Sequence, residues 1–293
     1  MILEEVVAPR HFHHLLVDGL NLAYRCFYAL PADLKNQAGF PTGAIRGWIS
    51  SLKRLQSTYS PEKIIVFFDH GLCSRRVELL PEYKAHRPMM PDELKAQLPV
   101  IKEITSCMGY SIIEENAVEA DDWIASYAAH LSLEKGYVGI VSADKDFAQL
   151  LDRSWIVQIL PPPSATPKVG WRILDAAGVQ AKWGIEPRQI VDYLSLVGDS
   201  ADHISGIAGV GPKTAVKWLK SHDSLEGIFQ NLARIEPKRF QAILLNEKEL
   251  LWRNRQLITL NTSLVPNFAT RIEGPSSEKL AVILNEMEIR MAL

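Results

Sequence analysis

Nine acidic side chains occupy positions from which a folded chain can bring them together. Asp18, Asp69 and Asp144 each end a short apolar run, in the segments LLVD, VFFD and IVSAD. In a parallel sheet the carboxyl ends of the strands share one edge, and open α/β sheets bind their ligands there. The other six acids follow in EADD, ADKD and GDSAD; they are Glu119, Asp121, Asp122, Asp146, Asp199 and Asp202.

Carboxylates in this number would repel one another, and several would have to stay protonated unless cations neutralised them. Oxygen ligands without cysteine or an obvious histidine favour Mg²⁺ or Mn²⁺ over zinc. Several carboxylates can hold two such ions about 4 Å apart for in-line displacement at phosphorus. The alternative is that acids at strand ends and helix starts only favour helix dipoles, which explains any one residue more easily than all nine. If their segments are helical, the pairs Glu119/Asp122 and Asp199/Asp202 would each share a helix face.

A basic segment containing proline, HGLCSRRVELLPEYKAHRP, follows the apolar run that ends at Asp69. It lacks an apolar period, which is typical of a long loop, and long loops of this kind usually carry function. Its cations could clamp phosphates while the ring of Tyr83 stacks on an unpaired base. A solvated charged surface is the alternative. The basic residues are Arg75, Arg76, Lys84, His86 and Arg87.

A glycine-rich segment, GIAGVGPKTA, differs from a phosphate-binding P-loop by one inserted proline, Pro212. No strand-like run precedes it and the spacing from glycine to lysine is changed, so an ATPase is disfavoured. The better interpretation is a helix-hairpin-helix-like turn in which Gly209 and Gly211 let backbone amides approach DNA phosphates. A plain turn between helices is the alternative. Neighbouring residues expected to contact DNA are Lys213, Thr214, Lys217 and Lys220.

Apolar periodicity predicts the elements that would position these residues. Five short β-type runs alternate with longer segments, which predicts a mainly parallel sheet covered by helices. Their sequences are HHLLVDG, KIIVFFD, YSIIEE, YVGIVSAD and WIVQIL. Helical spacing predicts one helix around Ile45–Leu55 and another from about Pro91 to Met108, where Gly109 stops it.

The chain has 293 residues, 47% of them hydrophobic, which suffices for a well-buried core and a smaller companion portion. We expect an α/β domain over residues 1–184 with a basic arch segment at about 70–108. After PPPSATP the composition becomes helical, and a further strong strand is expected only in the C-terminal tail. A helical DNA-binding portion over residues 185–293 should follow, with its helix-hairpin-helix-like motif at about 199–220.

The net charge of −2 and the pI near 6.5 argue, taken alone, against a polyanionic partner. If nine acids form one metal cluster, 34 minus nine leaves 25 acids against 32 Lys and Arg, an excess of seven positive charges elsewhere. No apolar run approaches the roughly 18 residues needed to span a membrane, and no secretion signal starts the chain, so we expect a cytoplasmic protein. Cys26, Cys73 and Cys107 lie far apart, which argues for reduced, structural thiols.

In combination, these segments resemble the 5′ nuclease family. The resemblance rests on LVDGLNLAYRCFYAL, FFDHG followed by RRVELLPEYKAHRPMMPDELKAQLPVIKEI, VEADDWIAS, SADKDFAQLLD and GDSADHISGIAGVGPKTA. These motifs occur in order over roughly residues 14–225, and together they are far more specific than any one alone. The likeness is greatest to the N-terminal nuclease domain of bacterial DNA polymerase I, here as a free-standing enzyme.

The resemblance implies a PIN-like 5′ nuclease fold and a metal-dependent 5′-3′ exonuclease or flap endonuclease. Such an enzyme would cut branched or 5′-ended DNA in replication and repair. The resemblance also implies two Mg²⁺ ions, for which Mn²⁺ can substitute, and allows a K⁺ at the glycine motif. It suggests a monomer with DNA as substrate, RNA primers as a further substrate and a DNA polymerase as partner.

The resemblance further assigns site residues. One ion would lie among Asp18, Asp69, Glu119 and Asp121. The second ion or its surroundings would involve Asp122, Asp144, Asp146, Asp199 and Asp202. Lys84 and Arg87 match catalytic basic residues that approach the scissile phosphate from an arch through which a 5′ single strand passes. DNA contacts are implied for Arg75, Arg76, Tyr83, Gly209, Gly211, Lys213, Thr214 and Lys217.

One motif departs from the family pattern. GDSADHISGI places His203 where polymerase-linked relatives commonly carry asparagine, and Ser205 where they carry proline. Loss of the proline frees the backbone after the last expected metal ligand, which leaves the metal geometry and the pH profile open. Two alternatives to a DNA nuclease remain. One is an RNA-directed nuclease with a similar acidic site, and the other is a branched-DNA binding module that the altered motif leaves inactive.

Overall fold

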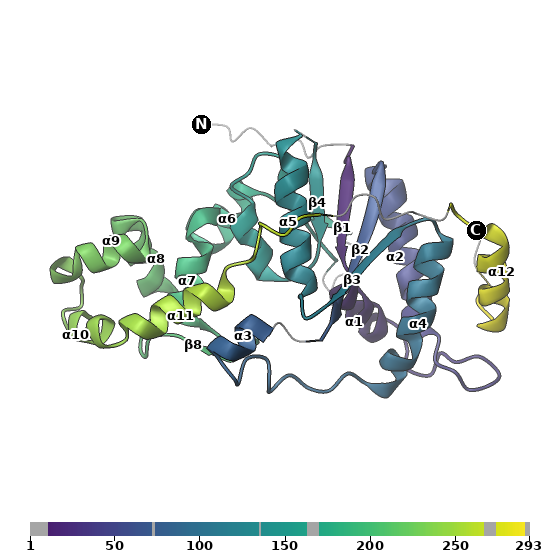
Figure 1. Cartoon of the computed structure of the whole chain (residues 1–293), viewed down its shortest axis with the longest axis horizontal. Coiled ribbons are helices and arrows are strands. Elements are labelled where there is room, and N and C mark those ends of the chain that lie inside the picture. The colour runs from purple at the N-terminus through teal and green to yellow at the C-terminus, as the bar shows by residue number, and fades with distance from the viewer. Residues whose placement is uncertain (1–10, 72–73, 135, 163–169, 267–273, 291–293) are drawn as a thin grey trace.

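A six-stranded sheet forms the centre of the molecule, with its strands in the order β3-β2-β1-β4-β5-β6 (Figure 1). The computed structural model describes residues 11–71, 74–134, 136–162, 170–266 and 274–290. The first five strands run parallel and the edge strand β6 is antiparallel. The strands are β1 (His14–Asp18), β2 (Lys63–His70), β3 (Ser111–Asn116), β4 (Val138–Val141), β5 (Ile156–Leu160) and β6 (Arg172–Leu174).

The parallel strands confirm the prediction made from the five apolar runs. Alternate side chains of β1 face opposite sides of the sheet: Leu15 and Val17 pack into one apolar cluster and Leu16 into another. Both faces are buried, which is why these strands read as nearly continuous apolar runs. Strand β6 was not predicted, because three residues, of which only Leu174 is buried, are too short to show a period.

Helices cover both faces of the sheet. One face carries α1 (Gly19–Ala29), α2 (Gly43–Tyr59) and α4 (Asp92–Cys107), and the opposite face carries α5 (Ala120–Leu133). The two predicted helices are therefore confirmed as α2 and α4. Trp48 of α2 is fully buried and donates its indole N–H to the hydroxyl of Thr105 on α4 at 2.9 Å, which joins the two helices.

The second part of the chain is mainly helical, as expected, and extends to one side of the sheet (Figure 1). A two-stranded hairpin, β7 (Gly198–Asp199) and β8 (Ile204–Ser205), interrupts it and was not predicted. The 3₁₀ segments are η1 (Lys145–Leu150), η3 (Pro187–Gln189) and η4 (Leu232–Arg234). The helices are α6 (Ala176–Trp183), α7 (Ile190–Val197), α8 (Pro212–His222), α9 (Leu225–Gln230), α10 (Arg239–Asn246) and α11 (Lys248–Ile258).

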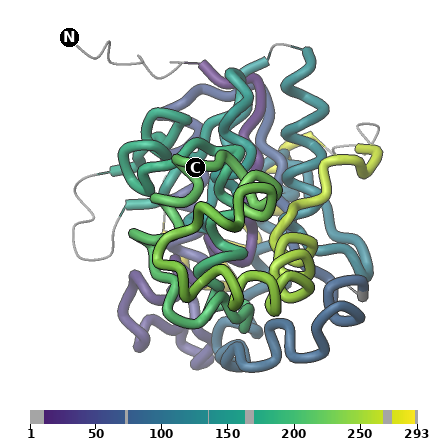
Figure 2. Tube along the Cα trace, turned by 90° about the vertical axis from the view of Figure 1, so that its left-hand side faces the viewer, coloured from purple at the N-terminus to yellow at the C-terminus, as the bar shows by residue number. Residues whose placement is uncertain are grey.

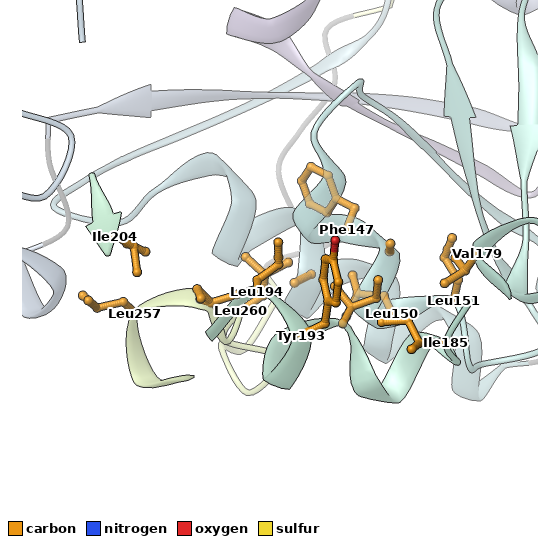
Figure 3. Close-up of a cluster of buried hydrophobic side chains, with 14 of the residues drawn as sticks. Phe147, Leu150, Leu151, Val179, Ile185, Tyr193, Leu194, Ile204, Leu257 and Leu260 are labelled. Carbon is orange, nitrogen blue, oxygen red and sulfur yellow. The ribbon is translucent and has the colours of Figure 1, made fainter. Parts of the chain in front are cut away.

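The helical part shares one apolar core with a face of the sheet. Figure 3 shows Phe147 and Leu150 of η1 beside Tyr193 and Leu194 of α7, with Leu257 of α11 in the same cluster. Burial of side chains of this size contributes roughly 1.5–3 kcal/mol each, so the joint is held by the ordinary hydrophobic effect. This shared core fixes the position of the acidic residues of the helical part relative to those of the sheet.

Two further segments differ from the expectations. The basic segment contains a short helix, α3 (Ser74–Leu79), where only a loop was expected. The C-terminal tail, where a strand was considered, forms helix α12 (Ser277–Glu286). This helix packs on α4, away from the other late helices, as Figure 1 shows at the right-hand end of the molecule.

Two simpler expectations concern membranes and cysteines. Within the described ranges, no helix has the length and apolar character needed to cross a membrane. Within the described residues, Cys26 and Cys107 are buried and form no disulfide, whereas Cys73 lies outside those residues.

Candidate active site at the carboxyl edge of the sheet

Four aspartates, which we call the first carboxylate cluster, meet at the carboxyl ends of the central strands. Asp18 ends β1, Asp69 lies near the end of β2, Asp144 follows β4 and Asp121 stands in the first turn of α5. Strand order reverses between β1 and β4, and ligands bind at such switch points in open α/β sheets. Each of these aspartates lies close enough to others of the cluster to perturb their ionisation.

Donors from the fold itself hold the first carboxylate cluster in place. Asp18 caps α1 by accepting the amide N–H of Asn21 at 3.1 Å, and its other oxygen accepts the hydroxyl of Ser142 at 2.8 Å. Asp69 accepts the amide N–H of Ala120 at 2.7 Å. Helix capping, the simpler interpretation of these acids, is therefore real for Asp18, but it does not account for four carboxylates in one place.

The carboxylates of the first cluster resist ionisation together. Burial, with the charges of Asp69 and Asp144, raises the pKa of Asp18 to about 7. Burial, followed by the charges of Asp18 and Asp144, raises the pKa of Asp121 well above its usual range. Such groups lose their protons readily only when a cation joins them. The donor set therefore fits a hard cation.

A second carboxylate cluster consists of Asp146, Asp199 and Asp202, each of which offers an oxygen within 4.8 Å of the others. Asp146 comes from η1, and the other two come from the β7–β8 hairpin. The expectation that Asp199 and Asp202 share a helix face is wrong, because a hairpin turn brings them together. Burial, followed by the charge of Asp144, raises the pKa of Asp146 to about 8.

Helix α11 holds the hairpin that carries Asp199 and Asp202 through hydrogen bonds from Asn254. Asn254 is fully buried and donates its amide to the carbonyl oxygens of Ser195, at 3.2 Å, and Ser205, at 2.7 Å. Gly198 begins the hairpin with a φ of +82°, a conformation that favours glycine. The second cluster therefore depends on the helical part, whereas the first depends on the sheet.

Lys145 is a functional candidate that sequence reasoning missed. Its ammonium lies 2.6 Å from an oxygen of Asp199 and 3.8 Å from one of Asp146. Burial lowers the pKa of Lys145, but its acidic neighbours raise it more, so it stays charged. The ADKD motif contained the signal, since a lysine between two expected ligands must lie near them.

Glu119 and Asp122 are held by a buried arginine. Arg76 donates to Glu119 at 2.6 Å and to both oxygens of Asp122 at 2.8 Å, and to the carbonyl oxygen of Leu257 at 2.9 Å. Asp122 also accepts the amide N–H of Asn261. Arg76 is thus 5% exposed, and its donors, like the oxygens of Asp122, are taken up by contacts within the protein.

From residue 74 on, the basic segment forms α3 and then crosses the carboxyl edge of the sheet toward α4 (Figure 1), and it lies at the lower end of the molecule in Figure 2. Lys84 approaches an oxygen of Glu119 at 3.1 Å, and Arg87 pairs with Asp202. The side chain of Lys84 is 9% exposed and that of Arg87 is 49% exposed. Arg87 therefore contacts the second cluster, whereas Lys84 contacts Glu119, which lies close enough to Asp69 of the first cluster to act on its ionisation.

Tyr83 lies inside the basic segment rather than on its surface. The residue is 4% exposed, so it offers no free ring face for stacking as it stands. Its hydroxyl donates to Glu119 at 3.4 Å and approaches Asp202 at 3.5 Å. Burial and the charge of Glu119 raise the pKa of Tyr83, which keeps the phenol a donor.

Two histidines join the basic segment to the hairpin. The rings of His86 and His203 meet edge to face with 4.1 Å between their centroids. His203 has a φ of +61°, which asparagine adopts more easily than most residues. Ser205, the other departure from the family motif, stands in β8 and pairs with Gly198. Arg75, by contrast, is exposed.

The glycine motif forms the turn that leads into α8. Gly209 has a φ of +80°, and Gly211 is the N-cap residue, followed by Pro212 in the first turn. Helix α7 packs on α8, and the connection between them contains the β7–β8 hairpin followed by this glycine turn. The expected DNA contacts on the surface of this motif are exposed or half-buried; they are Gly209, Gly211, Lys213, Thr214 and Lys217.

Comparison with known proteins relates this geometry to a family. Residues 13–184 match the family described as "5'-3' exonuclease, N-terminal resolvase-like domain", and residues 185–274 match "5'-3' exonuclease, C-terminal SAM fold". A 5′-3′ exonuclease of Aquifex aeolicus is 37% identical over 95% of this chain and 93% of its own length. DNA polymerase I of Streptococcus pneumoniae is 35% identical over 93% of this chain, which spans 31% of that longer protein.

Solved structures show the same fold. The T5 5′-exonuclease, in a structure with divalent zinc bound, superposes with a TM-score of 0.68 at 22% identity, covering 94% of this chain and 97% of that one. The catalytic core of Rad2, in complex with a DNA substrate, gives a TM-score of 0.62 at 16% identity, covering 96% and 90%. The chain belongs to the 5′-3′ exonuclease family.

Proposed function

We propose that this chain is a structure-selective 5′ nuclease that hydrolyses phosphodiester bonds at 5′ ends and 5′-flap junctions of DNA. The observation that carries the proposal is the pair of carboxylate clusters at the carboxyl edge of the sheet, with Lys84 and Arg87 of the basic segment drawn across them. Carboxylates can hold cations at a phosphate, and the two basic side chains can hold the phosphate itself.

Two Mg²⁺ ions, or Mn²⁺ in their place, would be held by oxygens of the two clusters. The first would draw on Asp18, Asp69, Asp121 and Asp144, and the second on Asp146, Asp199 and Asp202. When bound, the cations supply an activated water at neutral pH and stabilise charge on the reacting phosphate. A bacteriophage T5 flap endonuclease variant of similar fold has been solved as a pseudo-enzyme-product complex with DNA and metal ions, which supports this proposal.

The chain's own cations act on the phosphate. Lys84 pairs with Glu119, beside the first cluster, and Arg87 pairs with Asp202 of the second. A phosphate that binds between the clusters would therefore lie close to an ammonium and a guanidinium. Arg87 would exchange Asp202 for the phosphate, which it can bind through two parallel N–H donors. Arg76 positions Glu119 and Asp122 beneath them and is a positioning residue rather than a DNA contact.

Duplex DNA would lie on the helical part. We propose the division into an α/β domain over residues 1–184, with residues 70–108 forming an arch, and a helical DNA-binding portion over 185–293. Exposed Lys213 and Lys217 flank the glycine turn, where backbone amides at the start of α8 can face phosphates. A K⁺ at this turn, as the family resemblance allows, belongs to the same proposal.

The biological setting follows from the substrate. Action on 5′ flaps fits DNA replication and repair in the cytoplasm, with RNA primers as a further substrate and a DNA polymerase as partner. Polymerase I relatives support the partner, because they carry a matching region within a longer protein. We propose that the enzyme works as a monomer, since both clusters are built from one chain.

Cleavage of a labelled flap tests the proposal. Purified protein should cut a 5′-labelled flap DNA near its junction with Mg²⁺ and should not cut it with EDTA. Asp144→Ala should lower the rate by about 10²–10³, because a carboxylate of the metal site is lost. Asp152→Ala, an exposed aspartate nearby in sequence, is the matched control and should cut normally. Equal rates for Asp144→Ala and the wild type would show the site to be wrong.

A binding module without activity is the second candidate, favoured by His203 and its contact with His86 on the basic segment. It predicts tight binding of the flap DNA with no cut under either Mg²⁺ or Mn²⁺. His203→Asn, which restores the family residue, would then restore cleavage. A matched RNA flap in the same assay separates the RNA-directed nuclease, which would cut the RNA faster than the DNA.

A further inference from the structure

Lys145 places a positive charge inside the second carboxylate cluster. Its ammonium bonds an oxygen of Asp199 at 2.6 Å and lies 3.8 Å from Asp146, and its side chain is one-third exposed. It sits at the start of η1, whose Phe147 is fully buried, so the lysine is anchored by the core and not by the basic segment.

The two clusters differ in how their charge is balanced. Among the described residues, no aspartate of the first cluster forms an ion pair within 4 Å, whereas Asp199 pairs with Lys145 and Asp202 with Arg87. The third member, Asp146, has a buried oxygen, Oδ1, without a hydrogen-bond partner. The second cluster is thus partly neutralised by side chains, and an incoming cation there must compete with an ammonium.

We propose that Lys145 competes with the second cation for Asp199 and Asp146, so that this cation binds together with the substrate phosphate rather than ahead of it. The inference rests on the proposed function. A phosphate brings negative charge that can draw the ammonium away from the aspartates and can itself ligate the cation. The site therefore becomes fully loaded only when a phosphodiester is present, which prevents futile capture of ions in the wrong geometry.

Removal of the charge should strengthen binding of the second cation in the absence of nucleic acid. Lys145→Met keeps the length of the side chain and removes the ammonium, so the weaker class of sites should tighten by about fivefold, the effect of one partly exposed ion pair. Lys145→Arg keeps the charge and should remain within about twofold of the wild type. If Lys145 acted only through packing, Lys145→Arg would change the Mn²⁺ affinity as Lys145→Met does.

The experiment is calorimetric titration of the full chain with Mn²⁺ alone, without DNA. Lys102→Met is the matched control, because Lys102 pairs with Glu114 at 2.7 Å and is 30% exposed, close to the 33% of Lys145, but lies outside both clusters. This control should bind Mn²⁺ as the wild type does. The same titration repeated with a non-cleavable DNA flap should reduce the difference between Lys145→Met and the wild type.

The inference would be overturned if the weaker class of Mn²⁺ sites had unchanged or lower affinity in Lys145→Met. It would also be overturned if Lys102→Met raised the affinity of this class equally. Flap cleavage by the wild type is measured in parallel and decides the proposed function separately. If the wild type cleaves the flap and Lys145→Met binds Mn²⁺ as the wild type does, only the proposed role of Lys145 is rejected. If the wild type does not cleave the flap although Lys145→Met binds the second Mn²⁺ more tightly than the wild type, only the nuclease function is rejected.

Discussion

The sheet edge and the basic segment hold their functional groups by opposite means. At the sheet edge, Asp18 and Asp69 are fixed by backbone amides and a hydroxyl that the fold supplies. In the basic segment, Arg76, Lys84 and Arg87 are fixed mainly by the acids themselves. Asp18 and Asp69 are therefore positioned without any cation, whereas Lys84 and Arg87 take their positions from the carboxylates that they contact.

Because of this difference, the tip of the basic segment can move more easily than the carboxylates of the sheet edge. Backbone hydrogen bonds supplement the ion pairs of the segment: the amide N–H of Lys84 donates to the carbonyl oxygen of Asp202 at 3.4 Å, and others, such as Ala85 to Glu82, form turns within the segment. Half-exposed ion pairs such as Arg87–Asp202 contribute little net free energy, typically below about 1 kcal/mol. The tip of the segment can thus exchange its acidic partners for phosphates at small cost, while its base, at Arg76, stays fixed.

The largest effect should come from the sheet edge. Asp18→Asn should lower flap cleavage by about 10³ because it removes a charge that would hold a cation, while the cap on α1 survives through the amide oxygen. Gel assays with Mg²⁺ measure the rate, and circular dichroism checks the fold. Retained activity in a well-folded Asp18→Asn protein would place the chemistry elsewhere.

The base of the basic segment should matter for stability. Arg76→Ala leaves Glu119 and Asp122 buried without their partner, which should lower the free energy of unfolding by about 3 kcal/mol. Urea unfolding measures it, with the exposed neighbour Arg75→Ala as control, expected to change stability by less than about 0.5 kcal/mol. Similar losses in both variants would mean that the buried contacts of Arg76 are not what holds this base.

The pH dependence of the metal-free protein sharpens the same comparison. An aspartate with a raised pKa binds more protons when folded than when unfolded, so its contribution to stability is fully present below the unfolded pKa and is lost as pH rises to the folded pKa. With unfolded values near 3.8 and folded values of about 7 for Asp18 and about 8 for Asp146, stability in EDTA should fall as pH rises from about 4 to about 8 and should level off above that. Thermal melts should show this decline, and Mn²⁺ should reduce it. If stability in EDTA did not change with pH, the buried carboxylates would not have raised pKa values.

The smallest effect should appear at the tip of the segment. Arg87→Gln removes a half-exposed ion pair with Asp202, so global stability should change by less than about 1 kcal/mol. Hydrogen exchange should nevertheless become faster at the amides of Lys84 and Ala85, which form hydrogen bonds in this segment, and stay unchanged in β1. Equal protection of the segment in both proteins would show that the ion pair does not hold it.

Much of the fold could be predicted because its signals are local. Five parallel strands and the helices α2 and α4 are long enough for their apolar patterns to show in the sequence. The three-residue strand β6, the β7–β8 hairpin and the six-residue helix α3 are too short for a period, and their positions depend on neighbours. The tail was misjudged because α12 is stabilised by packing on α4, far away in sequence.

By itself, the sequence determined which chemistry is available. Strand-terminal Asp18, Asp69 and Asp144 had to meet, because parallel strands end at a common edge, and the carboxylate types alone favoured hard cations. The sequence could not decide which charged groups bind one another, since that depends on distances between segments separated by tens of residues. Only the tertiary structure buried Arg76 against Glu119 and directed the side chain of Lys145 toward the second cluster. The physical reason is that burial makes an unpaired charge costly, so each buried charge needs a partner that only the fold can bring near.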